Sequence, residues 1–179
     1  WIKTMNSYFL DFISRGRKLA KANAVSWDFT VLNDGTVERE KQWSLSVMSG
    51  ASLNPDVRLT FMGPDRKTVS LMLEKGLRPS DKRETWVHWQ DLAKAIILHK
   101  IYVSRNKPNP IKNSLVRPLL CLMAVAGNRP PWETTAADIR QTYDLLSELQ
   151  SSKKLAHDLR SLVRTVIDRD RLSNFSPIL

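Results

Sequence analysis

The sequence predicts an α+β fold, in which an amino-terminal helix and a small antiparallel sheet of about three strands precede a mainly α-helical bundle. Three observations lead to this prediction. Apolar residues recur every three or four positions at the amino terminus and again from about position 81, which is typical of amphipathic helices. Between these regions they recur at every second position, which is typical of half-buried strands. Turn-forming residues separate the strand-like runs. We therefore expect two domains, 1–80 and 81–179.

The first expected element is an amphipathic helix over residues 1–22. Its buried side is expected to carry Ile2, Met5, Phe9, Phe12, Ile13 and Leu19. Its far end is basic around Gly16, with Arg15, Arg17, Lys18 and Lys21. A basic run near a terminus is usually a solvated face, and contact with phosphate is the less common alternative.

Three strands are expected between residues 24 and 62. Their alternating apolar positions are Val25, Trp27, Phe29 and Val31, then Trp43, Leu45 and Val47, then Val57, Leu59 and Phe61. The sequence Asn33-Asp34-Gly35 supplies a turn, because glycine accepts a positive φ angle. Three antiparallel strands that share one apolar face would follow. Such a sheet is more commonly a scaffold than a ribbon that binds nucleic acid.

A short helix over 66–75 and a long helix come next. Gly76 ends the short helix, and the long one is expected to begin near Ser80 or Asp81. Apolar residues form one broad stripe on the long helix, at Trp86, Trp89, Leu92, Ala93, Ile96 and Ile97. The arrangement predicts a helix that is buried along one side.

The prolines indicate where the middle of the bundle is interrupted. Residues 105–113 are polar and contain two prolines, and they predict a loop between helices. Another helix follows to about Ala126, and Pro118 limits how early it becomes regular. Thr134 or Thr135 can cap the next helix, and Asp138 three residues after Thr135 resembles a capping box with Asp in place of Glu. The buried stripe of that helix is expected at Ile139, Tyr143, Leu146 and Leu149.

The last helix, over 152–170, has its residue types sorted by face. Its apolar stripe consists of Leu155, Leu159, Leu162, Val163, Val166 and Ile167. At about 100° per residue, Lys153, His157, Arg160 and Arg164 fall within about 60° of one another on the opposite side. A helix that is apolar along one side and cationic along the other can lie against a polyanion.

The overall charge points in the same direction. The formal net charge is +10 and the isoelectric point is near 10.0, which favours an acidic partner such as DNA, RNA or an anionic membrane. Residues 81–131 are the most cationic part, with nine basic and three acidic side chains. No apolar run approaches the roughly 18 residues of a membrane span.

Cysteine and histidine usage excludes several kinds of site. The single cysteine, Cys121, excludes an internal disulfide and a cysteine-rich zinc site, and it fits a reducing cytoplasm. His88 and His99 are eleven residues apart, or roughly 16 Å along one helix, which is too far to share a metal ion. No glycine-rich phosphate loop or nucleophile elbow is visible. We expect no cofactor, no metal and no small-molecule substrate.

Residues 81–177 contain several short motifs in a characteristic order. Trp132 precedes a polar turn and the pair Asp138-Ile139, and Tyr143 lies on the helix that follows. Residues 151–155 begin a last long helix, and residues 174–177 form the extended segment after that helix. This pattern resembles the core-binding domain of tyrosine recombinases, also called phage-type integrases. In that family Asn and Pro are usually adjacent in the segment after the last helix, whereas two residues separate them here.

The chain opens with Trp1 rather than Met, and we expect it to be a fragment of a longer protein.

The resemblance implies a helical domain that closes around one face of duplex DNA during DNA integration and recombination of a mobile element. The DNA contacts that it implies are Lys94, Arg105, Lys107, Lys112, Lys153, His157, Arg160 and Arg164. It also implies self-association on DNA, a location in the bacterial cytoplasm at the nucleoid, and no membrane partner. Phosphate contact is the commoner role for any single cation.

The string from His157 to Arg160 also matches the His-x-x-Arg box of the catalytic domain of the same family. That box acts with a tyrosine nucleophile downstream, whereas the last tyrosine here, Tyr143, precedes it. We interpret the match as a coincidence, and this chain by itself is not expected to be an enzyme. Two alternatives stay open: a DNA- or RNA-binding regulator unrelated to recombinases, and a helical protein-interaction module with solvated basic faces.

Overall fold

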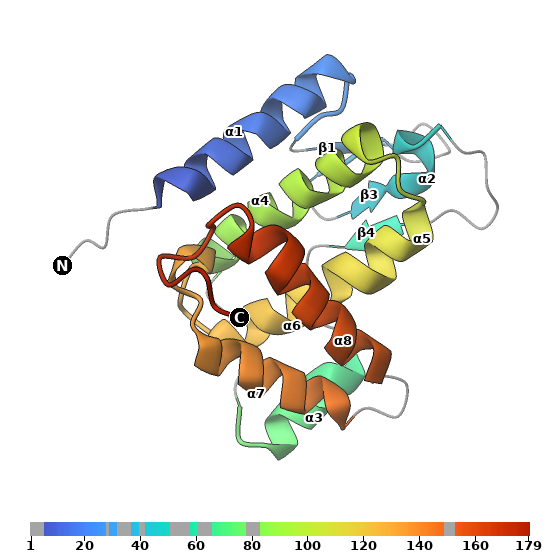
Figure 1. The fold of residues 1–179 in the computed structure, drawn as a ribbon. Coiled ribbons are helices and arrows are strands. Elements are labelled where there is room, and N and C mark those ends of the chain that lie inside the picture. Colours follow the sequence, from blue (N-terminus) through green and yellow to red (C-terminus); the bar gives the residue numbers. More distant parts are fainter. Residues whose placement is uncertain are drawn as a thin grey trace.

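The computed structural model is mostly helical, and its helices pack into a bundle with short strand pairs at one side (Figure 1). The structure describes residues 6–27, 29–31, 37–39, 42–50, 58–60, 66–77, 83–148 and 153–179. The α-helices are α1 (Ser7–Ala22), α2 (Leu45–Met48), α3 (Arg66–Glu74), α4 (Arg83–Leu98), α5 (Pro108–Pro110), α6 (Arg117–Ala126), α7 (Ala136–Ser147) and α8 (Lys153–Leu162). Wider π-helical segments η1 (His99–Val103), η2 (Ile111–Val116) and η4 (Val163–Asp168) and the 3-10 turn η3 (Pro131–Glu133) continue or connect them.

The expected single sheet of about three strands is not seen in the described residues. Instead, β1 (Phe29–Val31) pairs antiparallel with β2 (Val37–Arg39), and β3 (Gln42–Ser44) pairs antiparallel with β4 (Arg58–Thr60). In the first pair Thr30 lies opposite Glu38, and in the second Trp43 lies opposite Leu59. The turn expected at 33–35 lies outside the described residues, as do the side chains of Val47, Val57 and Phe61.

The strand expected through Trp43, Leu45 and Val47 ends early. Helix α2 begins at Leu45, directly after the last strand position. Three alternating positions are too few to distinguish a strand from the start of a helix. Both Trp43 and Leu45 are buried, so the expected core positions are confirmed. The expected strand is confirmed over Gln42–Ser44 and is wrong from Leu45 onward, where the chain is helical.

The loop expected over 105–113 is also shorter than predicted. The structure begins a helix at Pro108, with Lys107 at the capping position, and continues it through η2 and α6 to Ala126. Proline is favourable at the first helical position, because the missing N–H has no partner there and the ring fixes a helical φ angle. The π-helical η2 directly precedes Pro118, whose nitrogen cannot donate to the preceding turn. Prolines therefore start and widen this helix and do not break it.

Helix α1 packs against α4 and shares its core (Figure 1). Phe9, Phe12 and Ile13 are buried in one continuous apolar cluster with residues of α4, α6 and α8. The two helices approach closely at Gly16, where an added Cβ would lie 2.8 Å from the Cβ of Ala95. Only glycine leaves room for that approach.

Helix α3 also packs onto the bundle. Its Met72 is buried in a second cluster with Ala124 of α6 and Leu145 of α7. The prediction of a short helix ending at Gly76 is confirmed, since α3 ends at Glu74 and Gly76 has a φ angle of 74°. Elements from both sides of position 80 thus share apolar contacts, and the division into domains 1–80 and 81–179 stays a prediction.

Helix α4 lies at the centre of the bundle. Every residue from Leu92 to Leu98 is buried, so contacts surround the second half of this helix rather than covering one stripe. The apolar positions expected from Trp89 to Ile97 are confirmed as core, whereas the side chain of Trp86 lies outside the described residues.

Candidate nucleic-acid interface

Helix α8 and its continuation η4 keep the two faces that the sequence predicts. Of the six predicted apolar positions, Leu155 is half-buried against the core, and the other five are at most 4% exposed: Leu159, Leu162, Val163, Val166 and Ile167. On the outer side His157, Arg160 and Arg164 are exposed. The side chain of Lys153 lies outside the described residues. We call His157, Arg160 and Arg164 the α8 basic line.

The α8 basic line carries little compensating negative charge. In the described part of the chain no carboxylate forms an ion pair with any of its three members. The guanidinium of Arg160 lies 5.9 Å from the centre of the Tyr143 ring on α7, an arrangement that holds the side chain without neutralising it. Asp168 on η4 faces the carboxyl terminus instead, because its carboxylate accepts hydrogen bonds from the backbone N–H groups of Ile178 and Leu179. The line is therefore a cationic surface open to an external anion.

The turn before α7 gives this surface a firm support. The capping box is confirmed: Thr135 Oγ1 accepts from the backbone N–H of Asp138, and the Asp138 carboxylate accepts from the backbone N–H of Thr135 at 2.9 Å. Arg129 donates two further hydrogen bonds to the same carboxylate, one of them over 2.6 Å from Nη1 to Oδ2. Because α7 packs along α8, this anchored turn fixes the helix that carries Tyr143.

The pKa shifts of Asp138 and Arg129 are consistent with the hydrogen bonds between them. Asp138 is only 4% exposed. Burial alone would raise its pKa, but the hydrogen bonds from Arg129 and Thr135 outweigh burial and hold the pKa below its ordinary value. The same contact with Asp138 raises the pKa of Arg129. The pair stays ionised at neutral pH, and its role is structural.

Lys94 is a correction to the predicted contacts. Its side chain is 4% exposed, and its Nζ donates to the backbone carbonyl of Trp27 over 2.7 Å. The ammonium group also lies 5.7 Å from the Trp27 ring and 5.8 Å from the Trp43 ring. A buried lysine with these partners cannot reach a phosphate on the molecular surface, so we no longer assign Lys94 to the DNA contacts.

The three loop cations lie elsewhere on the molecule. Arg105 and Lys107 are exposed on the connection from η1 into α5, and Lys112 is half-buried within η2. Arg105 lines a shallow cavity together with Asn23 at the end of α1 and Met48 of α2. Figure 1 places this connection beside α2 and the strands. Arg105 and Lys107 therefore lie on the connection before α5, whereas η2, which carries Lys112, also contacts α8.

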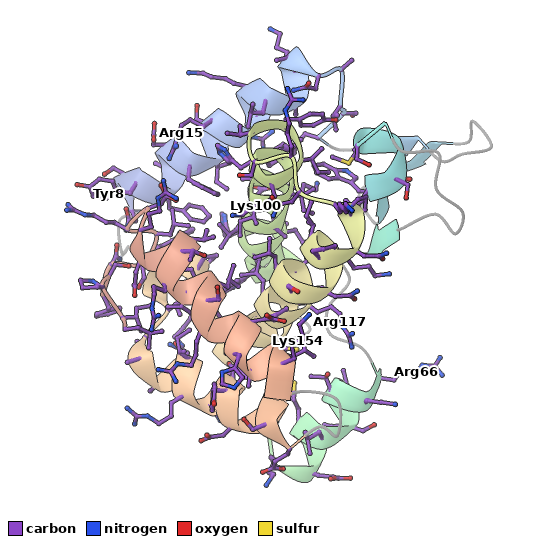
Figure 2. The ribbon with its side chains drawn as sticks, turned by 45° about the vertical axis from the view of Figure 1, so that its right-hand side comes forward. Tyr8, Arg15, Arg66, Lys100, Arg117 and Lys154 are labelled. Carbon is purple, nitrogen blue, oxygen red and sulfur yellow. The ribbon has the colours of Figure 1, made fainter. Side chains whose placement is uncertain are left out.

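Two cations that the sequence reasoning left out lie at the start of α8 and α6. Figure 2 shows Lys154 and Arg117 on the same side of the molecule, and α8 contacts α6. Both side chains are exposed. Lys154 lies about 100° around the helix from its neighbour at 153. It was therefore not included in the single row of cations that the sequence predicted on the last helix. Arg117 is remote in sequence, and only the packing of α6 against α8 indicates its position.

The histidines do not share a site. His88 packs edge-on against Trp132, His99 stacks on Phe12, and His157 is exposed on α8. Within the described ranges, no group of three or more His, Cys, Asp or Glu side chains could hold a metal ion. Nor is any described helix both long and apolar enough to cross a membrane. Cys121 is buried and is not part of a disulfide.

A scan against protein-family models, a search of curated proteins and a search of solved structures found no match to this chain.

Proposed function

We propose that this chain is a non-catalytic, duplex-DNA-binding part of a site-specific tyrosine recombinase, acting in DNA integration in the bacterial cytoplasm. The observation that carries the proposal is the α8 basic line, three exposed side chains on a helix whose opposite face is buried. The net charge of +10 adds a general attraction to a polyanion. The resemblance of residues 81–177 to a core-binding domain supplies the specific family.

The spacing of the line suits a phosphate backbone. From His157 to Arg164 the helix rises roughly 10 Å, at about 1.5 Å per residue. Phosphates of one DNA strand advance about 3.4 Å each along the duplex axis, so the line matches the length of about three of them. Arginines that neutralise phosphates release counterions, and binding should weaken steeply as salt rises.

The His-x-x-Arg string takes part in this proposal as two exposed polar side chains, of which Arg160 supplies the charge. His157 and Arg160 are one helical turn apart and both exposed, and Tyr143 contacts the Arg160 side chain from α7. In this reading Tyr143 holds the arginine in place. Self-association on DNA is part of the same proposal.

A charge-reversal experiment tests the proposal. Fluorescence anisotropy with a labelled duplex measures the affinity of the unmodified chain, of Arg160→Glu with Arg164→Glu, and of Arg66→Glu with Lys67→Glu on α3. Both double variants change the net charge equally, and all four side chains are exposed. We expect the α8 variant to bind at least tenfold more weakly than the α3 variant. Equal affinities would refute a role for α8.

Two competitors separate the alternatives. A single-stranded RNA that displaces the duplex at equal concentration would favour the unrelated nucleic-acid regulator. Absence of binding to either nucleic acid at low salt would favour the protein-interaction module. In each case far-ultraviolet circular dichroism checks that the variants keep the helical content of the unmodified chain.

A further inference from the structure

A second cationic feature lies where α1, the end of α4 with η1, and the end of η4 meet. There the structure has a cavity of about 250 Å³. Its polar lining includes Arg15 of α1, Lys100 of η1, Ser104 directly after η1, and Arg169 and Asp170 directly after η4. Figure 2 shows Arg15 and Lys100 on this part of the molecule. None of these residues belongs to the α8 basic line.

The charges around the cavity are unbalanced. Three cations face one carboxylate, and that carboxylate, on Asp170, lies 3.6 Å from Nη2 of Arg15. Arg15 also pairs with exposed Asp11 at 3.1 Å. For Lys100 and Arg169, the described residues offer no carboxylate within ion-pair distance. Two uncompensated cations beside one cavity attract an anion and hold it from two sides.

The backbone that holds these side chains is well anchored. Phe12, Ile96 and Val166 line the apolar part of the cavity and are themselves buried. Two π-helical segments, η1 and η4, border it, and such widened turns occur frequently at functional sites. Its volume corresponds to about eight water molecules at about 30 Å³ each, which leaves room for a tetrahedral anion and part of its hydration shell.

We propose that this cavity is a phosphate-binding site, with Lys100 and Arg169 as the main contacts and Arg15 as the third cation. Guanidinium and ammonium groups are the usual partners of phosphate oxygens, and the Ser104 hydroxyl can donate one further hydrogen bond. The phosphate is either a free anion or part of a nucleic-acid backbone. In the second case α1 and η1 belong to the nucleic-acid surface together with α8. The site does not depend on the proposed function.

The first test uses inorganic phosphate alone. Phosphate is titrated at constant ionic strength into the 1–179 chain, followed by nuclear magnetic resonance of the backbone amides. The variants are Lys100→Gln, Arg169→Gln and the control Arg66→Gln, each of which removes one positive charge. Losing one charged contact is expected to weaken binding about tenfold, whereas the control keeps the unmodified affinity. Equal affinities in all three variants, or no saturable binding to the unmodified chain, would overturn the proposal.

His99 supplies a readout that needs no variant at the site. It lines the same cavity, and its Nε2 atom is buried without a hydrogen-bond partner in the described structure. Burial, then the charges of Arg15 and Lys100, hold the pKa of His99 below its ordinary value, and Asp170 opposes them. A phosphate bound between Lys100 and Arg169 adds negative charge nearby and should raise that pKa. An unchanged His99 titration at saturating phosphate would contradict the location of the site.

Duplex DNA separates the two sources of the phosphate. If Lys100→Gln and Arg169→Gln weaken duplex binding more than Arg66→Gln does, the cavity takes a backbone phosphate. If they lose inorganic phosphate but keep duplex affinity, it takes a free anion. The α8 double reversal should leave inorganic phosphate binding unchanged. A failure of the proposed function and a failure of this site therefore give different patterns.

Discussion

Replacing Asp138 by asparagine tests the anchor before α7. The change keeps the shape of the side chain but removes the charge that Arg129 and the Thr135 N–H bind. Loss of a negative charge in the first turn of a helix costs about 0.3–1 kcal/mol, and a hydrogen bond to a charged group contributes about 1.5–3 kcal/mol. Because the Arg129 side chain is 40% exposed, water replaces part of its contact. We therefore expect a loss of about 2 kcal/mol in the free energy of unfolding.

Urea denaturation at pH 7 measures this loss, and Asp144→Asn is the matched control, since Asp144 is exposed on the same helix. The pH dependence gives a second check. The pKa of Asp138 is lowered in the folded state, so its contribution is complete above the unfolded value of about 3.9 and is lost as pH falls through the folded pKa. The difference between the unmodified chain and Asp138→Asn should therefore narrow in acid. If Asp138→Asn is as stable as Asp144→Asn at pH 7, the Asp138 carboxylate does not stabilise the fold through Arg129 and Thr135.

Three further predictions concern the core. Gly16→Ala should lower the free energy of unfolding, measured by urea denaturation, by about 1–3 kcal/mol, because the new Cβ would lie 2.8 Å from the Cβ of Ala95 on α4. The control Ser14→Ala, on the exposed side of α1, should change this free energy little. Lys94→Met should leave the duplex affinity measured by fluorescence anisotropy unchanged, since Lys94 is buried. A loss of affinity as large as that of the α8 charge reversal would show that Lys94 contacts the DNA. Since burial lowers the pKa of His99, its contribution to stability is complete above the unfolded value of about 6.5 and is lost as pH falls below it. His99→Gln should remove that pH dependence from urea midpoints measured between pH 7.5 and 5, and an unaltered dependence would exclude His99 as its source.

Local sequence patterns were sufficient for the faces of α8. Its apolar stripe and its cations repeat every three or four residues over several turns, and a long periodic pattern specifies which side is buried. The Thr135 cap was equally local, since both partners lie within one turn. The surface proposed to bind DNA was therefore largely predictable in its residues.

Non-local packing decided what the sequence could not predict. Lys94 is buried because Trp27 and Trp43, far away in the chain, surround its ammonium group. The cationic cavity likewise joins Arg15 to residues about 85 and 154 positions further along. The strand pairs depend on partners and register, and alternation over three residues does not specify either. Charge alone therefore indicated a basic molecule but not which cations are exposed together.

The most direct test of the account is the salt dependence of duplex binding. The logarithm of the association constant, plotted against the logarithm of salt concentration, has a slope of about −0.9 per phosphate neutralised. Arg160→Gln with Arg164→Gln should make this slope less steep by about 2, while Arg66→Gln with Lys67→Gln should leave it unchanged. An identical slope for both double variants would contradict the claim that α8 lies against the DNA backbone.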